Sequence, residues 1–171
     1  MKPILRRTLT GSALLGLAGC GFRPLYSRHD KIDASEHLDE VNVDIIPDRQ
    51  GQLLRQALQQ RLEGAGDGRT KRFGLAVVYS LASDPIAIQR DSTSSRVRVT
   101  ATATWTLRSL QPGQGVLTSG LARMMDGFNI IDQQYFAADM ENEDAQRRVA
   151  ESIAGQITLQ MASYFSKKQL T

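Results

Sequence analysis

The residue with the most definite chemistry in this sequence is Cys20, the single cysteine of the 171-residue chain. It completes the sequence LAGC at residues 17–20, which is typical of the bacterial lipobox. In such proteins the thiol takes a diacylglyceryl group, the leader is cut before the cysteine, and the new amine is acylated. Because two or more acyl chains hold a protein firmly on a bilayer, we expect Cys20 to be a permanent membrane anchor.

The residues before the cysteine predict export. Residues 1–19 combine a basic start, an apolar run and small residues before the cleavage site, which are the three parts of a signal peptide. The apolar run is far shorter than the roughly 20 residues of a membrane-spanning helix. Gly21 follows the cysteine instead of an aspartate, which favours sorting to the outer membrane. The pair Arg6 and Arg7 is compatible with either general or twin-arginine export.

Little in the sequence could perform catalysis. The two histidines, His29 and His37, fall in a stretch that we interpret as a polar tether, residues 20–40, away from any nucleophile. No cluster has metal-ligand spacing, and we attribute the acids at residues 139–144 to the start of a helix. We therefore predict no enzyme, no catalytic residue, no metal and no cofactor.

The charge balance argues against a nucleic-acid partner. The formal net charge is +3, but the leader contains three basic residues and no acid. The mature chain is therefore neutral, and the basic character that nucleic-acid binding requires is missing. Its composition, with 41% hydrophobic and 23% charged residues, is that of a globular protein.

Periodic patterns over residues 41–168 predict a single domain. Alternation at 41–46 predicts a first strand, and leucines at every fourth position from Leu54 to Leu62 predict a helix that begins near Gln50 with Asp48 as N-cap. The clearest signal is residues 96–108, where apolar residues alternate with threonine and arginine, as in a strand with one wet face. The remaining predicted segments are a strand at 72–81, a turn at 112–115, a strand at 116–125, a loop at 127–138 and a helix at about 141–167.

This order, β-α-β-β-β-α, predicts an α+β fold. We expect a two-layer sandwich in which two helices pack on one face of a four-stranded, largely antiparallel sheet. The threonine and arginine side chains then lie on the other face.

Arginines on that exposed face have two interpretations. Arg96, Arg98 and Arg108 belong to the alternating strand, and Arg90 lies on the preceding loop. They could simply be solvated side chains on the strand surface that discourage pairing of the sheet with another chain. Alternatively, their guanidinium groups form a cationic patch for an anionic partner, since they match phosphate geometry. Arg90, Arg96 and Arg98 are the candidate binding residues.

The start of the mature chain, CGFRPLY at residues 20–26, resembles that of the LptE family of lipopolysaccharide-assembly lipoproteins. The leucine-rich helix, the threonine-alternating strand and the segment from Tyr135 to Ile157 are also similar to that family. The resemblance covers nearly all of the mature chain.

The resemblance implies a partner and a task. Family members sit in the lumen of LptD, an outer-membrane β-barrel, as a plug and assembly aid, and they bind lipopolysaccharide for delivery to the outer leaflet. It also implies a lipid-anchored protein on the periplasmic side of the outer membrane. The alternative is a lipoprotein that faces the periplasm and binds lipid or peptidoglycan on its own.

Overall fold

The computed structural model describes residues 37–62, 70–88, 94–130 and 135–169. They all belong to one compact unit, residues 32–171. The predicted signal peptide, Cys20, the tether up to residue 36 and Arg90 lie outside the described residues. The fold is therefore described from His37 onward.

The predicted α+β class and element order are confirmed. The strands form one sheet in the order β1-β2-β3-β4, in which β1 is parallel to β2 and the other pairs are antiparallel. The elements are β1 (Val41–Val43), α2 (Asp48–Leu62), β2 (Phe73–Ile88), β3 (Ser94–Ser109), β4 (Val116–Asn129) and α3 (Tyr135–Gln169).

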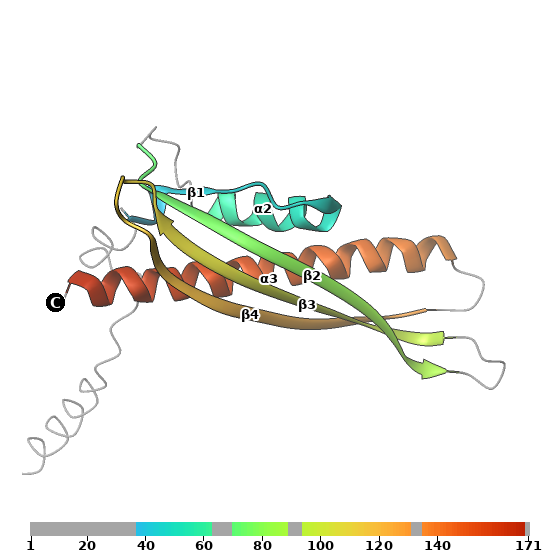
Figure 1. Cartoon of the computed structure of the whole chain (residues 1–171). Coiled ribbons are helices and arrows are strands. Elements are labelled where there is room, and N and C mark those ends of the chain that lie inside the picture. Colours follow the sequence, from blue (N-terminus) through green and yellow to red (C-terminus); the bar gives the residue numbers. More distant parts are fainter. Residues whose placement is uncertain (1–36, 63–69, 89–93, 131–134, 170–171) are drawn as a thin grey trace, which may run out of the picture. The chain divides into compact units, whose positions relative to one another are not determined.

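The two helices form the second layer (Figure 1). Helix α3 packs against β3, β4 and α2, whereas α2 also contacts β1. The 35 residues of α3 span about 52 Å, and the 16 residues of β3 span about 54 Å. The helix and the strand are therefore of nearly equal length.

The alternation of β3 divides the sheet into two faces, as predicted. The odd-numbered residues Val99, Ala101, Ala103, Trp105 and Leu107 are buried against the helices, on what we call the inner face. The even-numbered residues carry the threonine and arginine side chains to the opposite side, the open face.

Trp105 organises the inner face and joins it to α3. Its ring lies over Gly120 of β4, where an added Cβ atom would be 2.7 Å from the Trp105 Cζ2 atom. The indole Nε1 donates to Gln160 Oε1 at 2.8 Å, and Gln160 Nε2 donates to the carbonyl oxygen of Leu121 at 3.1 Å. A second glutamine, Gln156, donates to the carbonyl oxygen of Arg123 at 3.3 Å. Helix α3 thus satisfies two backbone acceptors of the edge strand β4. These carbonyl groups are then not available to pair with a strand of another chain.

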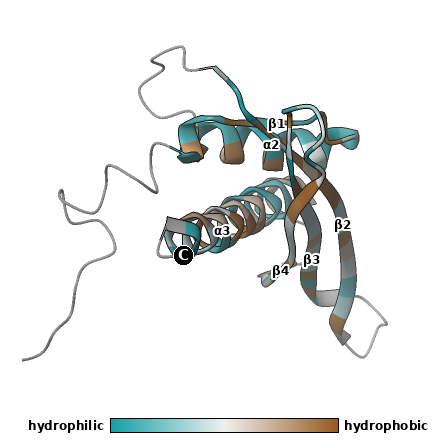
Figure 2. Cartoon of the chain, turned by 60° about the vertical axis from the view of Figure 1, so that its left-hand side comes forward, coloured by the Kyte–Doolittle hydropathy of each residue, from teal (hydrophilic) through white to brown (hydrophobic). Residues whose placement is uncertain are grey.

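The leucine stripe of α2 is buried as predicted. Leu54, Leu58 and Leu62 are fully buried, and Figure 2 shows that the apolar side of α2 faces α3. The helix begins at Asp48, two residues before the predicted start. Asp48 has φ of 68°, a left-handed conformation that aspartate adopts more readily than most residues.

Strand β2 continues for seven residues beyond its predicted end at Leu81, even though it contains Pro85. The carbonyl oxygen of Leu75 accepts from the Asp44 N–H, so the odd-numbered backbone groups of β2 point away from β3. Pro85 has this same parity, and its missing N–H is therefore not needed by the ladder with β3. A proline at an edge is compatible with a strand for this reason.

The loop predicted at residues 127–138 is wrong at both ends. Strand β4 continues to Asn129, and α3 begins at Tyr135. The acids that were assigned to the helix start lie further along α3, whose first turn contains none. Glu143 instead pairs with Arg49 of α2 at 2.9 Å, and Asp144 pairs with Arg147 at 3.1 Å. Glu143 and Asp144 therefore pair with arginines rather than cap the helix.

The last residues assigned to the tether, 37–40, pack against the domain. The ring centroid of His37 lies 5.2 Å from that of Phe165 on α3. Lys71 Nζ donates to the carbonyl oxygen of Asp39 at 2.9 Å. Residues 37–40 therefore belong to the packed domain rather than to the tether.

Candidate functional site

The open face is the largest surface of the sheet that the helices leave uncovered. Its central column consists of Thr100, Thr102, Thr104 and Thr106, which are exposed or half-buried. The β2 neighbours of these threonines are Ala82, Ser80, Val78 and Ala76, and their β4 neighbours are Met125, Arg123, Leu121 and Ser119. The face therefore combines hydroxyl groups with small and apolar side chains.

Two of the predicted binding residues lie together at one end of this face. Arg96 and Arg98 are both exposed, and residues two apart on one side of a strand are separated by about 7 Å. Arg96 lies opposite Asn129, and its Nη1 donates to Asn129 Oδ1 at 3.5 Å. Arg98 lies opposite Gly127. The structure thus brings two of the three candidates together, and the third, Arg90, lies outside the described residues.

The β4 residues Gly127 and Asp126 make their closest contacts elsewhere. A Cβ atom added on Gly127 would lie 3.1 Å from the Val97 carbonyl oxygen, and 3.7 Å from Arg96 Nε, which is an ordinary contact distance. Asp126 is the nearest acid in the β4 sequence, but its Oδ2 accepts from Arg148 Nε on α3 at 2.7 Å. This hydrogen bond raises the pKa of Arg148. Asp126 therefore binds a side chain of the helix layer.

Arg98 has a carboxylate as its β2 neighbour without pairing to it. Asp84 is its Cα partner across the ladder. Within the described ranges, however, no ion pair includes Arg98. Its guanidinium therefore offers donors to an external anion.

Arg108, at the other end of the same row, is a structural residue. Its Nη2 lies 2.9 Å from Asp44 Oδ2, so it joins β3 to the segment after β1. A Cβ atom on Gly74 would be 2.9 Å from Arg108 Nε, which shows that this side chain also lies over a glycine. The sequence could not reveal this ion pair of Arg108, because its partner is 64 residues away.

Other open-face residues were not identified from the sequence. Arg123 is exposed on this face opposite Thr102, and it adds a further exposed cation. Val78, Leu121 and Met125 are large apolar side chains that remain exposed there. Exposed apolar residues that gather on one surface are a mark of interaction sites. Only the pairing of the strands shows that these residues share the threonine face.

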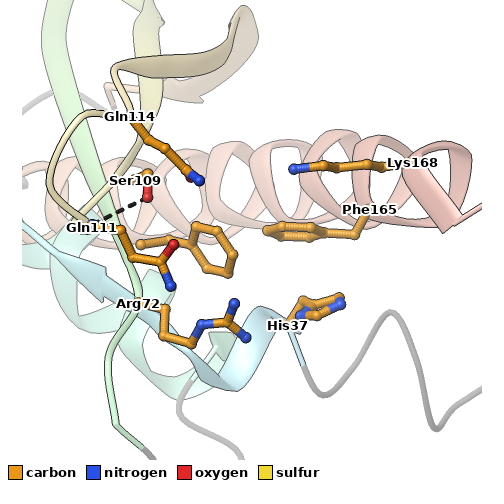
Figure 3. Close-up of a pocket in the computed structure, with 8 residues that line it drawn as sticks. His37, Arg72, Ser109, Gln111, Gln114, Phe165 and Lys168 are labelled. Carbon is orange, nitrogen blue, oxygen red and sulfur yellow. Dashed lines mark hydrogen bonds between the residues drawn. The ribbon is translucent and has the colours of Figure 1, made fainter.

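A separate pocket of about 310 Å³ lies at the end of the domain where residues 37–40 pack (Figure 3). Phe73 and Phe165, whose ring centroids are 5.2 Å apart, form its apolar part. Its lining residues are His37, Arg72, Phe73, Ser109, Gln111, Gln114, Phe165 and Lys168.

Within the described residues, two kinds of site are absent. No group of three or more His, Cys, Asp and Glu side chains is placed to hold a metal ion in the part of the chain that the structure covers. None of the helices in these ranges is both long enough and apolar enough to cross a bilayer.

Comparison with known families gives one match. Residues 38–161, more than half of the chain, match the family described as LptE, lipopolysaccharide-assembly. No curated protein matches the sequence.

Solved structures share the fold. A lipoprotein from Caulobacter crescentus CB15 is 22% identical with a TM-score of 0.62, and covers 78% of this chain and 96% of its own. The rare lipoprotein B from Shewanella oneidensis is 14% identical with a TM-score of 0.52, covering 76% of this chain and 96% of its own. Lipoprotein B from Nitrosomonas europaea is 13% identical with a TM-score of 0.52, covering 74% and 82%. At these identities the likeness establishes the fold.

Proposed function

The chain belongs to the LptE family of lipopolysaccharide-assembly proteins, and from this premise we propose that it is a non-catalytic outer-membrane lipoprotein that supports the LptD barrel and binds lipopolysaccharide. In this proposal the signal peptide over residues 1–19 is removed and Cys20 is acylated. The residues up to 40 connect the anchor to the domain at 41–168, which faces the periplasm.

The observation that carries the lipopolysaccharide part is the pair Arg96 and Arg98 on the open face. Both guanidinium groups are exposed at one end of a sheet surface that is otherwise rich in threonine. Lipid A phosphates are anions that guanidinium groups bind through charge-assisted hydrogen bonds. Arg90 is included in the proposal on its chemistry alone.

The barrel part rests on the open face as a whole. Val78, Leu121 and Met125 remain exposed beside the threonine column. A polar surface with several exposed apolar side chains suits contact with another protein. We propose that this face docks on the barrel polypeptide.

The lipopolysaccharide proposal is tested with the double variant Arg96→Ala, Arg98→Ala of the mature lipoprotein. Binding of purified lipopolysaccharide is measured in neutral detergent. Loss of two charge-assisted contacts is expected to weaken binding by about tenfold or more.

The matched control removes two exposed arginines from the helices, Arg61→Ala and Arg147→Ala. It has the same net charge as the test variant, and its binding should stay close to that of the unchanged protein. If both double variants bind lipopolysaccharide equally, the open-face arginines only solvate the strand.

A further inference from the structure

The pocket beside His37 has a lining rich in hydrogen-bond donors. Arg72 precedes β2, Gln111 and Gln114 belong to the β3–β4 turn, and Lys168 lies in the last turn of α3. Figure 3 shows the Lys168 amine and the Gln114 amide directed toward one another, and the Arg72 guanidinium directed toward His37. Donors from three separate parts of the chain therefore line one pocket together with two phenylalanine rings.

The charges at this pocket favour an anion. Arg72 and Lys168 are both cationic, and none of the described residues that line the pocket carries a carboxylate. The nearest described acid contact is Glu40, whose Oε2 lies 3.4 Å from Arg72 Nη1 and 3.4 Å from His37 Nδ1. That single carboxylate engages one nitrogen of a guanidinium group that has five N–H donors.

The shape of the donor set selects among anions. A carboxylate is planar and is best bound by one bidentate arginine, whereas a phosphate accepts donors from several directions. Here the donors are a guanidinium, an ammonium and an amide on different elements. Phe73 and Phe165 add an apolar surface that would contact carbon atoms attached to the anion.

We propose that this pocket binds the phosphate of a glycerophospholipid headgroup, at a site separate from the open-face arginines. This inference rests on the proposed lipid anchor, because His37 follows Cys20 by 17 residues. A chain of that length spans at most about 60 Å, which keeps the pocket within reach of the membrane surface. The site would hold this end of the domain against the bilayer.

An adjacent basic residue provides a matched control. Lys167 is next to Lys168 in the sequence, but it is not among the lining residues. The substitutions Lys168→Gln and Lys167→Gln remove the same charge from the same helix end, and Arg72→Gln tests the second lining cation. General attraction to an anionic surface would respond equally to the two lysine substitutions.

The experiment measures binding of short-chain phosphatidylglycerol to the full mature lipoprotein in neutral detergent. Glycerol phosphate, inorganic phosphate and purified lipopolysaccharide are measured in parallel. We expect Lys168→Gln and Arg72→Gln each to weaken phosphatidylglycerol binding by about tenfold, and Lys167→Gln to weaken it by less than about twofold.

Each other result would overturn the proposal. Equal losses of phosphatidylglycerol binding in Lys168→Gln and Lys167→Gln would mean that the protein is attracted only by general surface charge. No measurable binding by the unchanged protein would mean that the pocket is not a lipid site. Equal binding of glycerol phosphate would assign the pocket to a free phosphate compound, and pocket-dependent binding of lipopolysaccharide alone would assign it to that lipid. Co-purification of the LptD barrel with the tagged lipoprotein, and lipopolysaccharide binding through Arg96 and Arg98, are measured on the same variants. If these persist while phosphatidylglycerol binding is absent, the lipid inference fails and the proposed function stands.

Discussion

The two faces of the sheet are built from alternate residues of the same strand, yet they satisfy different requirements. On the inner face Val99, Trp105 and Leu107 are almost fully buried. On the open face Arg98 and Thr104 are exposed. Packing fixes the inner residues, because a change of even one methyl group is felt in a close-packed core. The open residues are free to serve a partner, so substitutions on the two faces should have separable effects.

Gly120→Ala is expected to have the largest effect on folding. The new Cβ atom would meet the Trp105 ring at 2.7 Å, and this ring is held by its hydrogen bond to Gln160. Overpacking of this kind costs about 1–3 kcal/mol of unfolding free energy. Denaturant unfolding of the mature protein measures it.

Gly115→Ala is the matched control, because nothing lies within 4 Å of the added atom there. Its unfolding free energy should change by less than about 0.5 kcal/mol. Equal stability of the two variants would contradict the rigid packing of the inner face.

Tyr79 gives the inner face a pH dependence. Its hydroxyl is buried, and within the described residues it has no hydrogen-bond partner. Burial raises the pKa of Tyr79 from 10.0 to about 12. The unfolded chain therefore loses this proton at lower pH than the folded chain. As a result, the free energy of unfolding is not reduced by Tyr79 ionisation below pH 10, and it falls as the pH rises toward 12.

The measurement is the unfolding free energy of Tyr79→Phe and of the unchanged protein from pH 8 to pH 11. The variant should lose less stability above pH 10. At neutral pH it should be at least as stable, because phenylalanine removes a buried hydroxyl that lacks a partner. Parallel curves for the two proteins would show that Tyr79 titrates normally.

The sequence predicted the parts of the fold that have strict periodicity. The alternation of β3 and the four-residue leucine spacing from Leu54 to Leu62 both proved to mark buried positions. The ends of elements were less predictable, since Pro85 and Gly127 normally interrupt strands. Pro85 is accommodated because its missing N–H lies on the side of β2 that faces away from β3.

The candidate sites were predictable only in part. Arg96 and Arg98 follow from the alternation of one strand, whereas the role of Arg108 depends on Asp44 in a different segment. The pocket was not predicted, because its lining comes from residues as far apart as His37 and Lys168. Arg72 and Gln114 have no sequence pattern that relates them.

The most direct test of the account is recovery of the LptD barrel with the tagged, full-length mature lipoprotein in mild detergent. Leu121→Lys alters the open face, and Leu159→Lys alters α3 at a leucine of similar exposure, 58% against 51%. We expect the unchanged protein and Leu159→Lys to recover the barrel, and Leu121→Lys to recover about a tenth as much, because a buried unpaired charge is costly at an interface. Equal recovery by both variants would contradict docking through the open face, and no recovery by the unchanged protein would contradict the proposed function.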